Sequence, residues 1–168
     1  LQAWRDARGA LIAAFAAFDP AARLPWYGPP MGARSFLTAR LMETWAHGQD
    51  VRHAVGLAPE GSNRLRHIAH LGVVTRSWSY RVRGMEPPEG EARVELVAPD
   101  GGEPWTWGPP DAPNRVRGTA LEFCLVVTQR RHVDDTSLVT EGDAATEWMR
   151  IAQCFAGGPT LATPSRRR

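Results

Sequence analysis

The sequence predicts an α+β fold in which a helical first half is followed by a mixed second half. Apolar residues recur at helical spacing up to about residue 80, and beyond residue 92 they alternate with polar residues as in a half-buried strand. Between these patterns, the segment MEPPEGE (85–91) contains two prolines and a glycine, which mark it as a linker. We therefore expect a helical domain over 1–84, a small α+β domain over 92–157 and a flexible tail over 158–168.

The first half is expected to contain three helices. Leu11, Phe15 and Phe18 share a helical face that stops at Pro20, and Gly56 supplies the stop signal of the second helix. The expected helices cover 1–18, 35–55 and about 63–80, with a Pro/Gly loop over 24–32 that also carries Trp26 and Tyr27. Because the first residue already lies inside a helical pattern with no capping residue before it, we expect a further segment of chain upstream.

The second half alternates between strand and helix patterns. Val94 and Leu96 alternate with charged residues, and the turn PDGGEP leads into Trp105 and Trp107, so a β-hairpin is expected here. Further along, we expect a buried helix over 119–129, a short strand over 137–140 and a closing amphipathic helix over 143–155.

Composition excludes several classes of protein. A chain of 168 residues with 43% hydrophobic content can bury a substantial core, and no apolar run approaches the length of a membrane span, about 18 residues. We therefore expect a cytoplasmic protein without a membrane partner. The net charge is only +2 and no nucleic-acid-reading motif is present, so no nucleic-acid partner is expected either. Cys124 and Cys154 form no paired motif and are expected to be buried free thiols.

Three potential ligands occur in the stretch LMETWAHGQDV (41–51). At about 100° per residue, His47 lies about 40° from Glu43 around the helix, and Asp50 lies about 20° to the other side. A glutamate and a histidine four residues apart can both reach one ion, and catalytic zinc takes nitrogen and oxygen ligands from about three residues. The alternative is an ordinary solvated pair on the helix surface, worth a few tenths of a kcal/mol.

The segment RSFLTARLMETWAHGQDV (34–51) resembles the metal-binding helix of the mycothiol-dependent maleylpyruvate isomerase family, whose members are DinB-like helical bundles. Those proteins carry E-x-x-x-H followed by an aspartate. The segment RLRHIAHLGVVTRSWSYRVRG (64–84) resembles the next bundle helix, and 92–157 is similar to the small sterol-carrier-like α+β domain that many members add. The likeness is closest to actinobacterial members, and it implies a partial bundle that lacks its first helices.

The resemblance implies a site and a chemistry. Glu43 and His47 would bind a divalent metal such as zinc, and Asp50 would orient a histidine or the helix end. The family takes its remaining histidine ligand from a helix upstream of this chain, and His70 is a reserve ligand here. In the family, the metal activates the thiol of mycothiol for an isomerase or thiol transferase reaction. A small anionic substrate would need cations, for which the candidates are Arg76, Arg81 and Arg83.

Two other functions stay open. The aromatic and apolar residues of the second half could line a cavity for an apolar ligand, although they could equally form the core; they are Trp105, Trp107, Phe123, Leu125 and Trp148. The partial bundle could instead bind a partner. In that case an exposed apolar face would pair two copies of the chain, or pair with the upstream segment.

Overall fold

The computed structural model describes residues 1–25 and 30–163, so the loop aromatics Trp26 and Tyr27 and the end of the tail lie outside the described residues. The expected α+β class is confirmed: helices fill the first half, and a four-stranded sheet follows in the second. Within the described ranges, no helix is both long enough and apolar enough to cross a bilayer.

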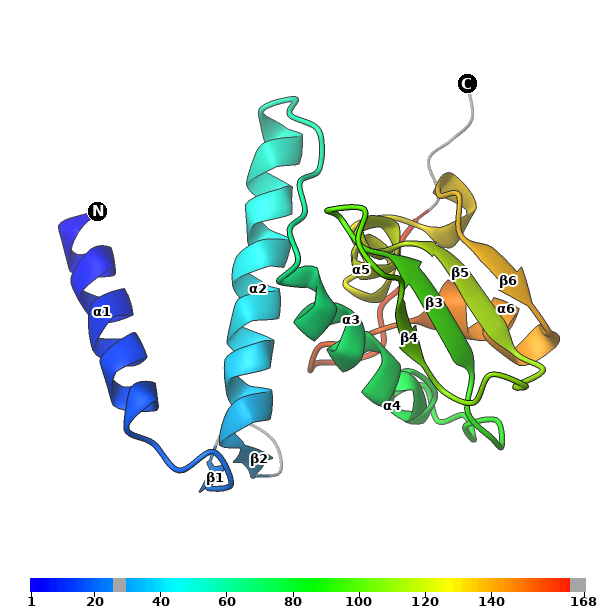
Figure 1. Ribbon diagram of the computed structural model, residues 1–168, viewed down its shortest axis with the longest axis horizontal. Helices are drawn as coiled ribbons and strands as arrows, with labels where there is room; N and C mark the ends of the chain where they lie inside the picture. The colour runs from blue at the N-terminus through cyan, green and yellow to red at the C-terminus, as the bar shows by residue number, and fades with distance from the viewer. Residues whose placement is uncertain (26–29, 164–168) are drawn as a thin grey trace.

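The first two helices agree with the sequence prediction. Helix α1 spans Gln2–Ala16 and helix α2 spans Ala33–Ala54, and the two-residue strands β1 (Arg23–Leu24) and β2 (Met31–Gly32) pair between them. In Figure 1, α1 stands apart from α2 along most of its length. The stacked rings of Phe15 and Phe36, 6.0 Å apart, join the two helices near the turn.

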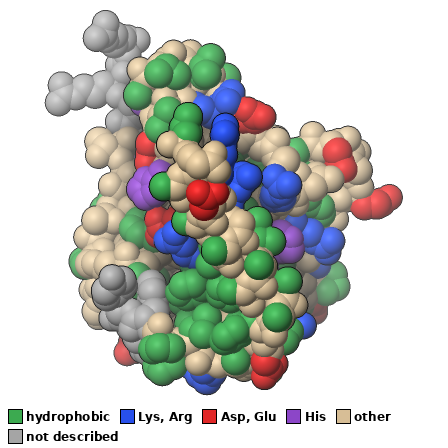
Figure 2. Space-filling view, turned by 90° about the vertical axis from the view of Figure 1, so that its left-hand side faces the viewer, with side chains coloured by type: hydrophobic (Ala, Val, Ile, Leu, Met, Phe, Trp, Pro, Cys, Tyr) green, Lys and Arg blue, Asp and Glu red, His purple; other side chains and the backbone are tan. Residues whose placement is uncertain are grey.

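Helix α1 leaves its apolar side chains exposed. None of its residues is buried, and Trp4 and Ile12 are 57% and 63% exposed. Figure 2 views the molecule from the α1 side and shows hydrophobic side chains gathered on this face. Pairing of this face, with a second copy or with an upstream segment, stays a prediction.

The prediction of a single third helix is wrong. It is divided into α3 (Leu65–Val74) and α4 (Arg76–Arg81) at Thr75. At the break Thr75 has φ −94° and ψ 12°, outside the helical range, and its hydroxyl donates to the Leu71 carbonyl at 2.7 Å. A threonine inside a helical pattern is only a weak stop signal, so the apolar periodicity predicted one continuous helix across Thr75.

The sheet has the order β4-β3-β5-β6. Strand β3 (Arg93–Val97) pairs antiparallel with β4 (Trp105–Trp107), which confirms the predicted hairpin. Strand β5 (Arg115–Thr119) runs parallel to β3, and β6 (Val139–Glu141) pairs with β5. Strand β5 was not predicted from the sequence. Its segment RVRGT has one large apolar residue, Val116, and the strand is defined by its pairing with β3.

The two helices predicted in the second half are confirmed. Helix α5 (Ala120–Val127) begins at Thr119, whose hydroxyl accepts from the Glu122 N–H at 3.2 Å, an N-cap contact. Helix α6 spans Asp143–Ile151 and ends earlier than expected. Figure 1 shows both helices behind the sheet, on one of its faces.

One buried cluster joins the two halves of the chain. Leu65 and Ile68 of α3 belong to the same core as Val94 of β3 and Phe123 of α5. The domain boundary over 85–91 stays a prediction, but the buried face of α3 packs against the second half. The tryptophans and apolar residues considered for a ligand cavity are core or pack against it, and both cysteines are buried and free, as expected.

Candidate metal-binding site

Helix α2 brings together the three polar residues whose spacing placed them on one face. The His47 ring lies between the two carboxylates: its Nε2 is 3.2 Å from Glu43 Oε2, and its Nδ1 is 3.0 Å from Asp50 Oδ2. The Glu43, His47 and Asp50 side chains are 45%, 67% and 48% exposed, so the cluster is open to solvent.

A fourth residue, Arg130, reaches this cluster from the turn after α5. Its Nε donates to Asp50 Oδ1 at 3.0 Å and one terminal nitrogen donates to Oδ2 at 2.8 Å, which is the two-point geometry that arginine forms with carboxylates. The other terminal nitrogen donates to the Thr128 carbonyl at 2.8 Å. The preceding residue, Gln129, has a φ of 61°, a left-handed conformation that turns the chain here.

Sequence reasoning missed Arg130. Arg130 lies in the charged segment RRHVDD (130–135), and nothing in this segment singles out one arginine as a partner of α2. The positive charge of Arg130 was the one feature of the sequence that was compatible with a contact to Asp50.

Asp50 is an ionised acceptor beside the His47 ring. Hydrogen bonds from Arg130, with a smaller contribution from His47, hold the pKa of Asp50 below its usual value, so this carboxylate is ionised and accepts hydrogen bonds. His47 Nδ1 lies 3.0 Å from Asp50 Oδ2 and 3.4 Å from a terminal nitrogen of Arg130, and because a carboxylate only accepts, the Asp50 contact is a hydrogen bond when Nδ1 carries the proton. In a neutral ring the Nε2 lone pair then faces Glu43.

With Nδ1 protonated in a neutral ring, Nε2 and Glu43 Oε2 are two acceptors 3.2 Å apart, and a metal ion between them would bind both atoms. With Nε2 protonated instead, the ring donates to Glu43, and Nδ1 can accept from the Arg130 terminal nitrogen that lies 3.4 Å away. Zinc binds histidine nitrogen and carboxylate oxygen at about 2.0–2.2 Å, so in a tetrahedral site these two atoms lie about 3.3 Å apart. Glu43 and His47 therefore fit two positions of such a site.

The cluster offers two potential metal ligands, Glu43 and His47. Across residues 1–25 and 30–163, no group of three His, Cys, Asp and Glu side chains is arranged to hold a metal ion. Asp50 lies on the opposite ring nitrogen from Glu43, so the two carboxylates do not converge on one point. Its position suits a residue that orients the histidine. His70 lines a groove between α2 and α3 instead, so its role as a reserve ligand stays a prediction.

The chain's own thiols are buried. Burial raises the pKa of the Cys154 thiol to about 12 and the pKa of the Cys124 thiol well above its usual value. Because the thiolate is the form that binds metals and attacks electrophiles, neither cysteine is reactive at neutral pH.

The three arginines considered for a substrate carboxylate have different surroundings. Arg76 donates to the Gly90 carbonyl at 2.7 Å and lies 5.9 Å from the Trp148 ring centre. Arg83 donates to the Ser79 carbonyl at 2.7 Å and to the Thr160 carbonyl, while Arg81 is exposed. Their role in substrate binding stays a prediction.

The fold and the cluster define a helical segment that carries a glutamate–histidine pair, joined to an α+β unit. Residues 1–52 match the model of the mycothiol maleylpyruvate isomerase N-terminal domain, which confirms the resemblance to this family. Residues 88–141 match the model of a second family, described as wyosine base formation. The sterol-carrier likeness expected for the second half is not confirmed by this match and stays a prediction.

Two relatives come from Mycobacterium tuberculosis, strains ATCC 25618 / H37Rv and CDC 1551 / Oshkosh, and both are described as uncharacterized proteins. Each is 48% identical to the chain over 156 residues, which cover 93% of this chain and 60% of the relative. The actinobacterial likeness is thereby confirmed, and the chain spans 60% of the length of these curated relatives.

Proposed function

We propose that the protein binds a divalent metal ion, zinc first among the candidates, through Glu43 Oε2 and His47 Nε2. We further propose that this metal serves thiol-dependent isomerase or transferase chemistry on a small anionic substrate. The observation that carries the metal proposal is the 3.2 Å separation of these two atoms, with Asp50 on the other ring nitrogen. The match of residues 1–52 to the isomerase family supports the same chemistry.

Each residue of the cluster has a separate role in this proposal. Glu43 and His47 hold the ion. Asp50 accepts a hydrogen bond from the Nδ1–H group of His47, and this keeps the Nε2 lone pair directed toward the ion. Arg130 holds both oxygens of Asp50 and thereby fixes the carboxylate that orients the ring. When bound, a divalent ion deprotonates a coordinated thiol and supplies a thiolate at neutral pH.

The burial of both cysteines favours a thiol that comes from outside the chain. Cys124 and Cys154 have raised pKa values and remain protonated at neutral pH. A small-molecule thiol such as mycothiol, which the family name specifies, meets this requirement.

Titration with Co²⁺ and Zn²⁺ tests the metal proposal on the purified protein. Glu43→Gln and His47→Ala remove one ligand each, and His53→Ala is the matched control because His53 is exposed on the same helix. We expect about one equivalent of metal in the wild type and in the control, and an affinity at least about tenfold lower in the other two variants. Equal affinity of His47→Ala and His53→Ala would overturn the proposal.

A further inference from the structure

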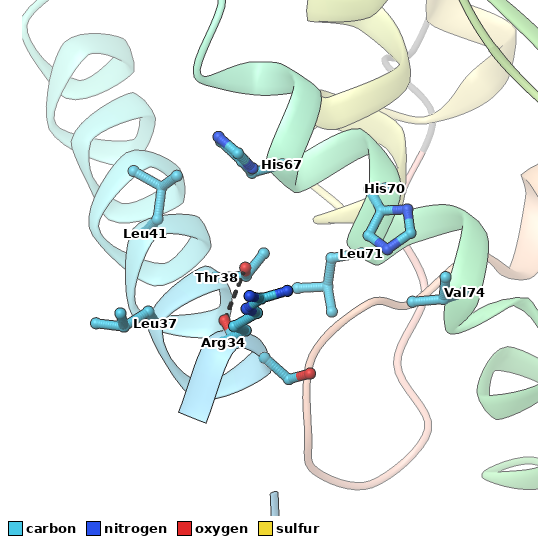
Figure 3. Close-up of a pocket in the computed structure, with 9 residues that line it drawn as sticks. Arg34, Leu37, Thr38, Leu41, His67, His70, Leu71 and Val74 are labelled. Atoms are coloured by element: carbon cyan, nitrogen blue, oxygen red, sulfur yellow. Dashed lines mark hydrogen bonds between the residues drawn. The ribbon is translucent and has the colours of Figure 1, made fainter. Parts of the chain in front are cut away.

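A groove of about 510 Å³ lies between α2 and α3. Its apolar wall is formed by Leu37 and Leu41 of α2 and by Leu71 and Val74 of α3. Figure 3 shows His67 and Leu71 of α3 pointing toward α2, where Arg34 and Thr38 lie. The volume falls within the range of small-molecule sites, about 300–1,000 Å³.

The polar part of the groove is basic. Arg34 of α2 and His67 and His70 of α3 line it, and no aspartate or glutamate is among its described lining residues. Figure 3 shows the Arg34 guanidinium group between the two helices. In the described part of the chain, this group has neither an ion pair nor a side-chain hydrogen bond, so its charge is available to an anion.

A contact with a tryptophan determines the tautomer of the neutral His70 ring. Trp107 Nε1 lies 3.3 Å from His70 Nδ1, and an indole nitrogen can only donate. His70 Nδ1 therefore accepts, and in the neutral ring the proton is on Nε2. The Nε2–H group of His70, a residue that lines the groove, is then a further hydrogen-bond donor.

The groove is separate from the Glu43–His47 cluster. At about 100° per residue, Arg34, Leu37 and Leu41 lie about 120–180° around α2 from Glu43. The two sites therefore occupy opposite sides of one helix, and a ligand of the groove does not depend on the metal proposal.

We propose that this groove binds a small amphipathic carboxylate. The hydrocarbon part packs against the leucines and Val74, and the carboxylate accepts hydrogen bonds from Arg34 and from His70 Nε2. Among the described residues, the groove combines an apolar wall, a guanidinium group without a partner and a lining without acidic side chains, and this combination favours an anion with an apolar tail over a neutral or cationic molecule.

Binding of octanoate to the metal-free protein tests this proposal, with 1-octanol and octyltrimethylammonium as neutral and cationic probes of similar chain length. Calorimetry gives the affinities, and NMR of the histidine ring protons locates the site. We expect octanoate to bind more tightly than either other probe and to shift the signals of His67 and His70. The expected loss in Arg34→Met is at least about tenfold, because a charge-assisted hydrogen bond is removed.

Arg40→Met is the matched control, since Arg40 is an exposed arginine of the same helix that does not line the groove. The proposal is overturned if octanoate does not bind, if Arg34→Met binds it as well as Arg40→Met does, or if octanol binds equally well. Shifts confined to His47 and His53 would also overturn it, because they would place the ligand on the other side of α2.

Discussion

The guanidinium group of Arg130 donates to both carboxylate oxygens of Asp50, at 3.0 and 2.8 Å, although the two residues lie 80 positions apart in the sequence. This contact ties the polar face of α2 to the turn that follows α5. Since Asp50 also contacts His47 Nδ1, the second half of the chain helps to orient the histidine of the candidate metal site.

Replacement of Arg130 is therefore expected to weaken metal binding without removing a ligand. Loss of such an outer partner lowers metal affinity by about 10–100-fold in known sites, and we expect Arg130→Met to fall in this range. Co²⁺ titration measures the effect. Arg131→Met is the control, because the neighbouring arginine does not contact the cluster. Equal affinities in the two variants would show that Asp50 positions His47 without help from Arg130.

The contact of α3 with α5 predicts opposite effects at two helical glycines. A Cβ at Gly72 would lie 2.9–3.1 Å from atoms of Val127 and Phe123, whereas a Cβ at Gly48 of α2 would meet nothing within 4 Å. We expect Gly72→Ala to lower the free energy of unfolding by about 1–3 kcal/mol through overpacking. Gly48→Ala should raise it by up to about 1 kcal/mol through helix propensity. Urea unfolding measures both, and stabilisation by both variants would contradict the packing described here.

The outer face of the sheet predicts an acid-dependent contribution to stability. Hydrogen bonds from Arg93 and Arg117, at 2.9 and 2.8 Å, hold the pKa of Glu95 below its usual value. A carboxylate with a lowered pKa in the folded state stabilises the fold above its unfolded-state pKa, and this contribution is lost as the pH falls through the folded-state pKa.

We therefore expect Glu95→Gln to be less stable than the wild type at pH 7, with the difference vanishing as the pH falls below the usual glutamate pKa of about 4.3. Urea unfolding at a series of pH values gives the difference, and Glu103→Gln, at an exposed position, serves as the control. A difference that stays constant from pH 7 into this acid range would count against the ion pairs.

The buried thiols predict a simple chemical result. Because burial raises the pKa values of Cys124 and Cys154, neither should react with a thiol reagent such as DTNB in the folded protein at neutral pH. Both should react once the protein is unfolded in guanidinium chloride. Fast reaction of one thiol in the folded protein would remove the argument for an external thiol.

The parts of the site that lie within one helix were predictable from sequence. Glu43, His47 and Asp50 share a face because helical geometry depends only on their spacing. The partnership of Arg130 with Asp50 was not predictable, because it depends on how the turn at Gln129 is placed against α2. Likewise, β5 has little apolar patterning and exists through its pairing with β3. The end of α3 lies at the non-helical backbone of Thr75, which the apolar periodicity does not register.

The coordination of zinc by His47 is the most direct test of the account. Zinc K-edge X-ray absorption of the zinc-loaded protein, without added thiol, distinguishes imidazole nitrogen from oxygen and sulfur ligands. We predict a shell with oxygen donors and one histidine, and a loss of the histidine signal in His47→Ala but not in His53→Ala. A histidine signal that persists in His47→Ala, or a shell that contains sulfur, would contradict the assignment of the site to Glu43 and His47.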